Sequence, residues 1–328
     1  MADYKAIKGH NIETVAGDPS VLQIGDIWYS STTKKIRGAK IGAGTFATGG
    51  DLNTADYGRQ GCGASQSAAL VAGGGANPAT ANSEEYNGSA WAEGDNLNQA
   101  RTYGGSGGTQ TAGIIFAGVF LNSAGPSPSP DVRQDTTETY DGSSWTEVAD
   151  LTTARQNTTG CGTTTSALCF GGSTGSDVTI AESYNGTSWT EVGDLNTARR
   201  YLNGAGATAT AALCMGGHPA RDITESFNGT SWTEVGDLNT GRHSGGTATQ
   251  GTNTSTLITG GVLPGTTTNT ELWDGSSWTE TTNASVSRNE LSGAGIQSDA
   301  IFMGGNTSPK AQTEEWTIGA SVETVAFD

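Results

Sequence analysis

Five arginines occupy one position in successive copies of a repeated segment, and Asp56 takes that place in the first copy. They are Arg101, Arg155, Arg199, Arg242 and Arg288. A ring of guanidinium groups around one opening can hold a carboxylate or sulfate of a glycan. The six positions are therefore the predicted ligand-binding residues. The alternative is that each arginine pairs with one of the equally repeated glutamates, Glu84, Glu138, Glu182, Glu225, Glu271 and Glu314.

Residues that would support catalysis or metal binding are sparse. His10, His218 and His243 are the only histidines, none lies at metal-ligand spacing from another, and none is near a Gly-x-Ser-x-Gly nucleophile elbow. We therefore expect no enzyme activity, no cofactor and no metal. A carboxylate pair for glycoside hydrolysis stays open among the 33 acidic residues, so a glycan-active enzyme remains a second alternative.

These side chains must be positioned by a repeat that runs through most of the chain. The segment ESYNGTSWTEVGDLNTAR at 182–199 recurs, with changes, in five clear copies. Their tryptophans are spaced by 54, 44, 43 and 46 residues, and Phe46 lies 45 residues before the first. The aromatic positions are Phe46, Trp91, Trp145, Trp189, Trp232 and Trp278. A period in the forties to fifties is typical of propeller blades.

Each period contains signals for four short strands. In the fourth copy these are a Gly- and Ala-rich innermost strand at 203–207, an apolar run at 211–217 ending in Gly-Gly, and strands at 223–227 and 231–235. An Asn-Gly or Asp-Gly pair always precedes the Trp strand, which indicates a tight hairpin. The pattern predicts a six-bladed β-propeller over residues 45–328. Its sixth blade lacks a Trp strand, so either 46–52 or 321–327 must close the ring.

The repeat resembles Kelch-type propellers, with Gly-Gly closing the second strand, an aromatic residue ending the third and Trp in the fourth. It looks most like the Kelch-like repeat proteins of tailed phages, whose N-terminal segments carry a motif similar to GDIWYSSTTKKIRG at 25–38. This resemblance implies a phage virion structural protein, either a tail fibre or spike or a head decoration protein, that attaches to the host surface. It would be assembled in the host cytoplasm and released by lysis.

Charge separates the chain into two parts. Residues 1–44 hold six basic and four acidic side chains (+2), and residues 45–328 hold 10 basic and 29 acidic ones (−19). A hairpin beginning at Val21 is too exposed to be stable alone. We expect 1–44 to be an anchoring arm in which Ile27, Trp28 and Tyr29 dock on other virion proteins or on further copies, with a trimer favoured.

The remaining observations narrow the partners. Acidity argues against nucleic acid, and no apolar run is long enough to span a membrane or to form a signal-peptide core. Cys62, Cys161, Cys169 and Cys214 are expected to be buried thiols. Variable connections at 75–82, 121–135 and 262–269 share the arginine face, so a host-surface saccharide or protein is expected to bind there. The other alternative function is a cytosolic Kelch-type scaffold that binds a peptide.

Overall fold

The computed structural model describes residues 12–22, 26–75, 78–121, 131–219 and 221–325. These residues form β-strands, turns and irregular segments, with no helix among them. Within the same ranges there is also no helix that is long and apolar enough to cross a membrane. The chain divides into two compact units, one of Met1–Thr45 with Thr317–Asp328 and one of Phe46–Trp316. We call them the terminal unit and the ring unit.

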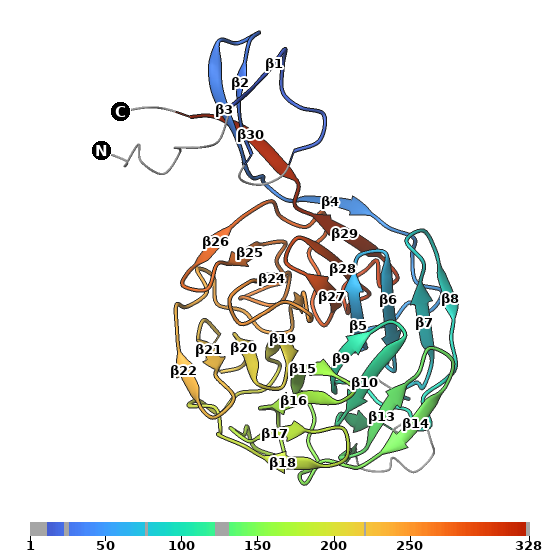
Figure 1. Cartoon of the computed structure of the whole chain (residues 1–328). Coiled ribbons are helices and arrows are strands. Elements are labelled where there is room, and N and C mark those ends of the chain that lie inside the picture. The colour runs from blue at the N-terminus through green and yellow to red at the C-terminus, as the bar shows by residue number, and fades with distance from the viewer. Residues whose placement is uncertain (1–11, 23–25, 76–77, 122–130, 220, 326–328) are drawn as a thin grey trace. The chain divides into compact units, whose positions relative to one another are not determined.

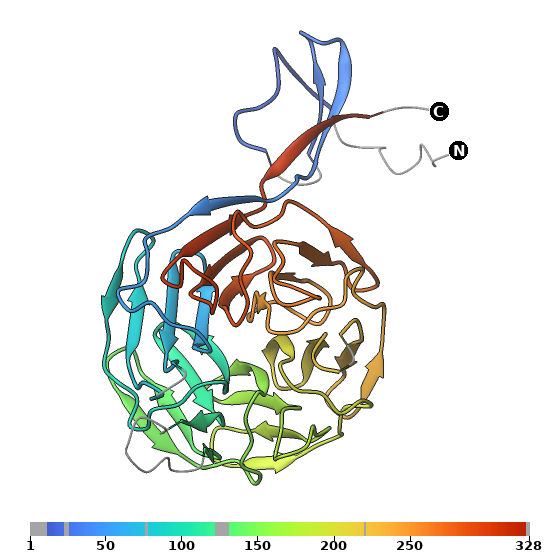
Figure 2. The same ribbon diagram turned by 180° about the vertical axis from the view of Figure 1, so that it is seen from behind.

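Six four-stranded sheets are found in the described part of the ring unit, and in five of them all four strands come from one sequence repeat (Figures 1 and 2). The first three sheets contain β5 (Gln60–Ser65), β6 (Ala68–Ala72), β7 (Ser83–Tyr86) and β8 (Trp91–Glu93); β9 (Gly105–Thr109), β10 (Ala112–Phe116), β13 (Thr137–Tyr140) and β14 (Trp145–Val148); and β15 (Thr159–Thr163), β16 (Ser166–Phe170), β17 (Ala181–Tyr184) and β18 (Trp189–Glu191). The next two contain β19 (Asn203–Thr208), β20 (Ala211–Met215), β21 (Thr224–Phe227) and β22 (Trp232–Glu234); and β23 (Gly246–Thr247), β24 (Thr256–Thr259), β25 (Thr270–Trp273) and β26 (Trp278–Glu280).

The sixth sheet combines strands from both ends of the ring unit. It is ordered β27 (Ser292–Ile296), β28 (Asp299–Met303), β29 (Thr313–Thr317) and β4 (Thr45–Thr48). The ring of Phe46 lies 4.8 Å from that of Trp316 and 6.0 Å from that of Phe302, measured between centroids. Of the two closing strands considered above, the one containing Phe46 therefore lies in this sheet.

The six inner strands, β5, β9, β15, β19, β23 and β27, surround a common centre. Each contacts the next, and β27 contacts β5. Such close approach of backbones explains the glycines of these strands. A Cβ added to Gly107 would lie 2.9 Å from Gly162 O in the neighbouring sheet, and one added to Gly160 would lie 2.4 Å from Phe116 Cζ. Larger residues would force the sheets apart.

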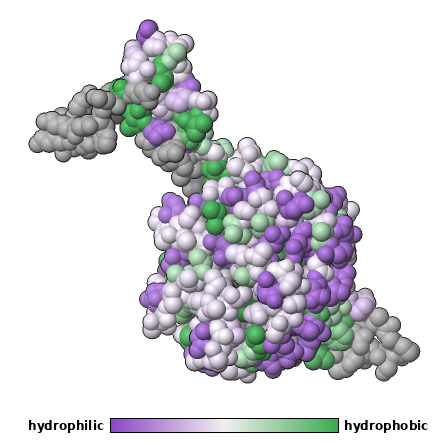
Figure 3. Space-filling model, turned by 45° about the vertical axis from the view of Figure 1, so that its right-hand side comes forward, coloured by the Kyte–Doolittle hydropathy of each residue, from purple (hydrophilic) through white to green (hydrophobic). Residues whose placement is uncertain are grey.

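Buried side chains fill the spaces between neighbouring sheets. Leu70 and Ile115 lie in one such cluster with Trp145, all at most 5% exposed. Some of the outer tryptophans also bond back into the preceding sheet: Trp189 Nε1 donates to Thr137 Oγ1 at 2.9 Å and Trp91 Nε1 to Thr313 Oγ1 at 3.0 Å. The repeated tryptophans are therefore structural. Hydrophilic and near-neutral residues cover most of the visible face of this unit (Figure 3).

The terminal unit contains a sheet with the order β1 (Glu13–Val15), β2 (Ile27–Ser30), β3 (Lys35–Ile41) and β30 (Ala320–Thr324). The sequence predicted a hairpin beginning at Val21, but Val21 and Leu22 lie in no strand, residues 23–25 are outside the described residues, and β2 begins at Ile27. Within β2 the alternate residues Trp28 and Ser30 are buried. Strand β30 pairs antiparallel with β3. The last residues, assigned to the propeller by sequence, thus belong to the terminal unit. A two-stranded sheet of β11 (Val119–Phe120) and β12 (Val132–Arg133) completes the strands.

Candidate functional site

The five repeated arginines are buried and paired with glutamates, so the prediction that they form a ligand-binding ring was wrong. Arg101, Arg155, Arg199 and Arg288 each place Nη2 2.7–3.0 Å from a carboxylate oxygen of Glu138, Glu182, Glu225 and Glu314, and Arg242 pairs with Glu271. All ten side chains are at most 2% exposed. The structure instead shows the alternative that the sequence left open, in which each arginine pairs with a repeated glutamate.

The first repeat contains the same pair, but Asp56 does not take part in it. Arg59, three residues later, places Nη1 2.7 Å from Glu84 Oε1 and supplies the missing arginine. Asp56 is 7% exposed and accepts a hydrogen bond from Tyr57 N at 2.8 Å, and burial raises the pKa of its carboxyl. The unpaired repeat glutamate, Glu84, was the sequence signal that an arginine had to lie nearby.

A ring of six backbone positions surrounds one mouth of the central channel, and we call it the collar. Its members stand two residues after each repeat arginine or Asp56, and all have a φ between 54° and 63°. They are Gly58, Tyr103, Asn157, Tyr201, Ser244 and Glu290. This left-handed conformation is unusual for residues other than glycine, and at non-glycine positions it is often found at functional sites.

Backbone hydrogen bonds join neighbouring members of the collar. Gly58 N donates to Glu290 O, Glu290 N to Ser244 O, and Ser244 N to Tyr201 O, at 2.8–3.0 Å. Tyr201 N donates to Asn157 O at 2.9 Å and Tyr103 N to Gly58 O at 3.0 Å. In the described chain no hydrogen bond joins Asn157 N to Tyr103 O. The collar is therefore a hydrogen-bonded ring that is open between these two residues.

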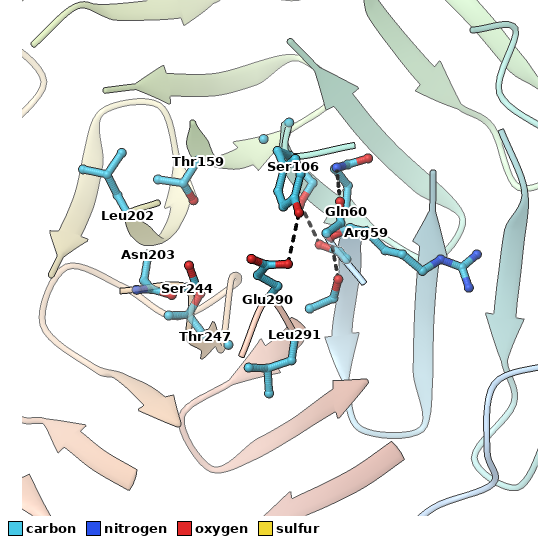
Figure 4. A pocket seen from close by; sticks show the side chains of 18 of the residues that line it. Arg59, Gln60, Ser106, Thr159, Leu202, Asn203, Ser244, Thr247, Glu290 and Leu291 are labelled. Carbon is cyan, nitrogen blue, oxygen red and sulfur yellow. Dashed lines mark hydrogen bonds between the residues drawn. The ribbon is translucent and has the colours of Figure 1, made fainter. Parts of the chain in front are cut away.

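The collar opens into a cavity of about 110 Å³ lined by the first residues of the inner strands (Figure 4). In the close-up, Glu290 lies at the centre, whereas the guanidinium of Arg59 points away toward the sheet interior. Asn203, Ser244 and Thr247 lie together on one wall and Gln60 on another. The lining combines polar side chains with glycine backbone and the apolar Leu202 and Leu291, and it is contributed by all six sheets.

Aromatic rings continue from the collar onto the surrounding face. Tyr103 and Tyr201 have centroids 6.2 Å apart in an edge-to-face arrangement, and Tyr201 lies 5.8 Å from His243. Arg200 places its guanidinium carbon 5.7 Å from the Tyr201 centroid and forms an ion pair with Asp177 at 2.7 Å. A flat ligand resting here would meet ring faces and edges together with a charged pair.

Burial shifts the titration of the groups at the mouth. Burial is the main cause of a raised pKa at Glu290, opposed by hydrogen bonds that include the one from the Tyr103 hydroxyl at 3.0 Å. It also lowers the pKa of His243 to about 4, with further lowering by Arg221 and His218. His243 is therefore neutral near pH 7, so its ring can contact apolar or hydroxyl-bearing groups.

The other predicted site residues have separate places. Trp28 is 2% exposed and so faces the interior of the terminal unit, whereas Ile27 is 46% exposed and Tyr29 is half-buried. The connection at 262–269 is described, but 122–130 and 76–77 of the other two predicted loops lie outside the described residues. Among the residues that are placed, no group of three or more His, Cys, Asp or Glu side chains could hold a metal.

Comparison with known proteins identifies the fold. No protein-family model and no curated protein matches the chain. Among solved structures, that of YjhT is similar, with a TM-score of 0.64 and 12% sequence identity over 84% of this chain and 99% of that one. The fold is that of a Kelch-type β-propeller. In a Kelch-type propeller the four-stranded sheets are blades and the cavity described above is part of the central channel.

Proposed function

We propose that the chain is a phage virion structural protein, a six-bladed Kelch-like propeller carried on a short terminal arm. The propeller binds a saccharide of the host surface at the collar and catalyses no reaction on it. The arm joins the protein to other virion proteins and to further copies of itself, as a tail fibre, a spike or a head decoration. This assembly takes place in the host cytoplasm.

The observation that carries the binding proposal is the contrast between repeated and varied residues. The arginine and glutamate of every blade are the same and are buried, whereas the collar position carries Gly, Tyr, Asn, Tyr, Ser and Glu. The varied residues face a common cavity with aromatic rings at its rim. Aromatic rings with convergent hydroxyl, amide and carboxyl groups can recognise a polyhydroxylated ring.

The virion part of the proposal rests on different features. The segment at 25–38 resembles the N-terminal motif of phage Kelch-like proteins, and it supplies β2, most of β3 and the turn between them. The ring unit has few exposed strand edges, because each sheet begins at the centre and ends in a short outer strand. Such a unit is suited to long exposure outside a cell.

The binding proposal is tested by removing one aromatic ring without disturbing the collar. Tyr201→Asn keeps a residue that tolerates the positive φ, and asparagine already stands at the equivalent position in Asn157. Loss of the ring should weaken binding on a glycan array by about tenfold, which corresponds to roughly 1.4 kcal/mol. The control is Ile296→Ala, an exposed apolar side chain at the far end of an inner strand.

Adsorption to host cells should follow the array result, with Tyr201→Asn impaired and Ile296→Ala unchanged. Equal binding by the two variants would refute the collar as the site. Absence of wild-type binding to every glycan and to every host-surface fraction would refute attachment. Labelling of purified virions with an antibody to the ring unit tests the virion assignment, and unlabelled particles would refute it.

A further inference from the structure

The central cavity is closed at depth by one side chain that spans the channel. Its lining extends from the collar only to the second residue of the longer inner strands, for example Gly160 in β15 and Gly293 in β27. Two residues further along these strands, Gln250 of the fifth sheet donates from its backbone N to Gly295 O at 2.9 Å and from Nε2 to Gly162 O at 3.1 Å. It thereby links the third, fifth and sixth sheets beneath the cavity.

The inner strand of the fifth sheet makes this crossing possible. Strand β23 covers only Gly246–Thr247, whereas the other inner strands have five or six residues. The chain then turns, with Gly251 N donating to Ala248 O at 2.9 Å, and this turn leaves Gln250 to reach across instead of continuing the ladder. The channel is therefore a pocket that is open at the collar and blocked at Gln250.

The walls of this pocket carry buried polar atoms that have no hydrogen-bond partner within the described protein. They are Gln60 Oε1, Asn157 Oδ1, Asn203 Nδ2 and Thr249 Oγ1. All four residues are at most 8% exposed. Leaving a buried polar group without a hydrogen-bond partner costs about 1–3 kcal/mol of stability. A ligand that enters through the collar and hydrogen-bonds to these atoms would recover this free energy. The unpartnered atoms offer amide acceptors, an amide donor and a hydroxyl, which are the complement of alcohol groups.

The size of the pocket limits what can enter. A volume of about 110 Å³ is well below the roughly 300 Å³ of pockets that enclose whole ligands. A hydroxymethyl or short polyol group fits inside, while a sugar ring stays at the collar, against the outer surface of the Tyr103 and Tyr201 pair. An internal stretch of a polymer has no way out, because Gln250 blocks the far side.

We propose that the site recognises the end of a saccharide chain, with a terminal hydroxyl-bearing group inserted into the pocket and the ring of the terminal sugar held at the collar. This inference rests on the proposed function and specifies which part of the saccharide is bound. The inserted group is uncharged, since the unpartnered atoms are neutral. Chain ends, and not repeated internal units, then determine where the protein attaches.

The experiment uses the full chain on an array in which each monosaccharide is present both as a terminal and as an internal unit of matched oligosaccharides. The expected result is binding only where the recognised sugar is terminal, and loss of binding when its exocyclic hydroxymethyl group is removed. Equal binding to terminal and internal forms would overturn end recognition and leave saccharide binding intact. Failure to bind any of the glycans would overturn both proposals.

Variants separate the pocket from the collar. The unpartnered Asn203 Nδ2 makes Asn203→Ala a mild change for the fold, and we expect about tenfold weaker binding through loss of one ligand hydrogen bond. Thr208→Ala, at the exposed far end of the same strand β19, is the control and should bind as wild type. Equal affinities of these two variants would overturn the insertion of a hydroxyl-bearing group into the pocket.

Gln250→Ala removes the side chain that crosses the channel below the pocket and should extend binding to sugars with longer exocyclic chains. An unchanged preference for chain length would count against Gln250 as the floor of the pocket.

Discussion

Replacing Glu225 by alanine tests whether the buried ion pairs hold the sheets together. Glu225 is fully buried, and its carboxylate accepts hydrogen bonds from Arg199 Nη2 at 2.7 Å and from Asn196 N at 2.7 Å. The alanine variant leaves the Arg199 guanidinium buried without its counter-ion. Breaking a buried pair from one side costs about 3–5 kcal/mol. At about 2 °C per kcal/mol for a unit of this size, we expect Tm to fall by about 6–10 °C.

The control and the refuting results come from the same sheet. Glu234 stands directly opposite Glu225 in the next strand but is exposed, so Glu234→Ala should change the free energy of unfolding by less than about 0.5 kcal/mol. Circular dichroism during heating measures both. The double variant Arg199→Met with Glu225→Leu removes both charges and should recover part of the loss. Equal Tm values for the two alanine variants, or a double variant less stable than Glu225→Ala, would refute the reasoning.

Three further predictions concern thiols, pH and the terminal unit. Burial raises the pKa of Cys62 and Cys214 to about 12, and all four thiols are free and buried. A thiol reagent at pH 8 should therefore label none of the four in the native protein and all four in guanidinium. Rapid labelling of the native protein would contradict this burial. The pKa of Glu290 is higher in the folded protein than in the unfolded chain, so protonated Glu290 stabilises the fold. This stabilisation is fully present below the pKa of the unfolded state and is lost as the pH rises through the pKa of the folded state. Glu290→Gln should therefore be stabilising at pH 7 and less so near pH 4, as measured by urea titration, and a pH-independent difference would exclude this linkage. Deleting 320–328 removes β30 from the edge of β3 and should make the terminal unit sensitive to protease while the Tm of the ring unit is unchanged; equal resistance of both chains would show that β30 is dispensable.

The sequence allowed prediction of the β-propeller fold because its signals are local and recur. Each Asn-Gly or Asp-Gly pair indicates a hairpin from a few neighbouring residues. The regular spacing of Trp91, Trp145 and Trp189 then shows that the same four-stranded pattern repeats along the chain. The prediction of a Kelch-type propeller is confirmed by the similarity to YjhT. The closing strand was narrowed to two segments, since Phe46 and the C-terminal tail both had the pattern of a strand.

The site was harder to predict because a repeated residue attracts attention and is mostly structural. Arg199 and Glu225 recur because every sheet needs the same buried pair, whereas the collar is found by asking which position changes between repeats. Glu290 and Tyr103 are 187 residues apart and meet only when the ring forms. Gln250 is the extreme case, because no local pattern indicates that an irregular turn after β23 reaches two other sheets.

The position of β4 has a consequence for biosynthesis. This strand is translated before the first complete repeat, whereas its partner β29 is translated after every other strand of the ring unit. Until then Phe46 has no Trp316 to pack against, and Leu52 and Val71 lack the cover of Ile301. A polypeptide that ends before β29 therefore leaves the apolar side chains of the sixth sheet exposed, and we expect proteolysis to remove such chains.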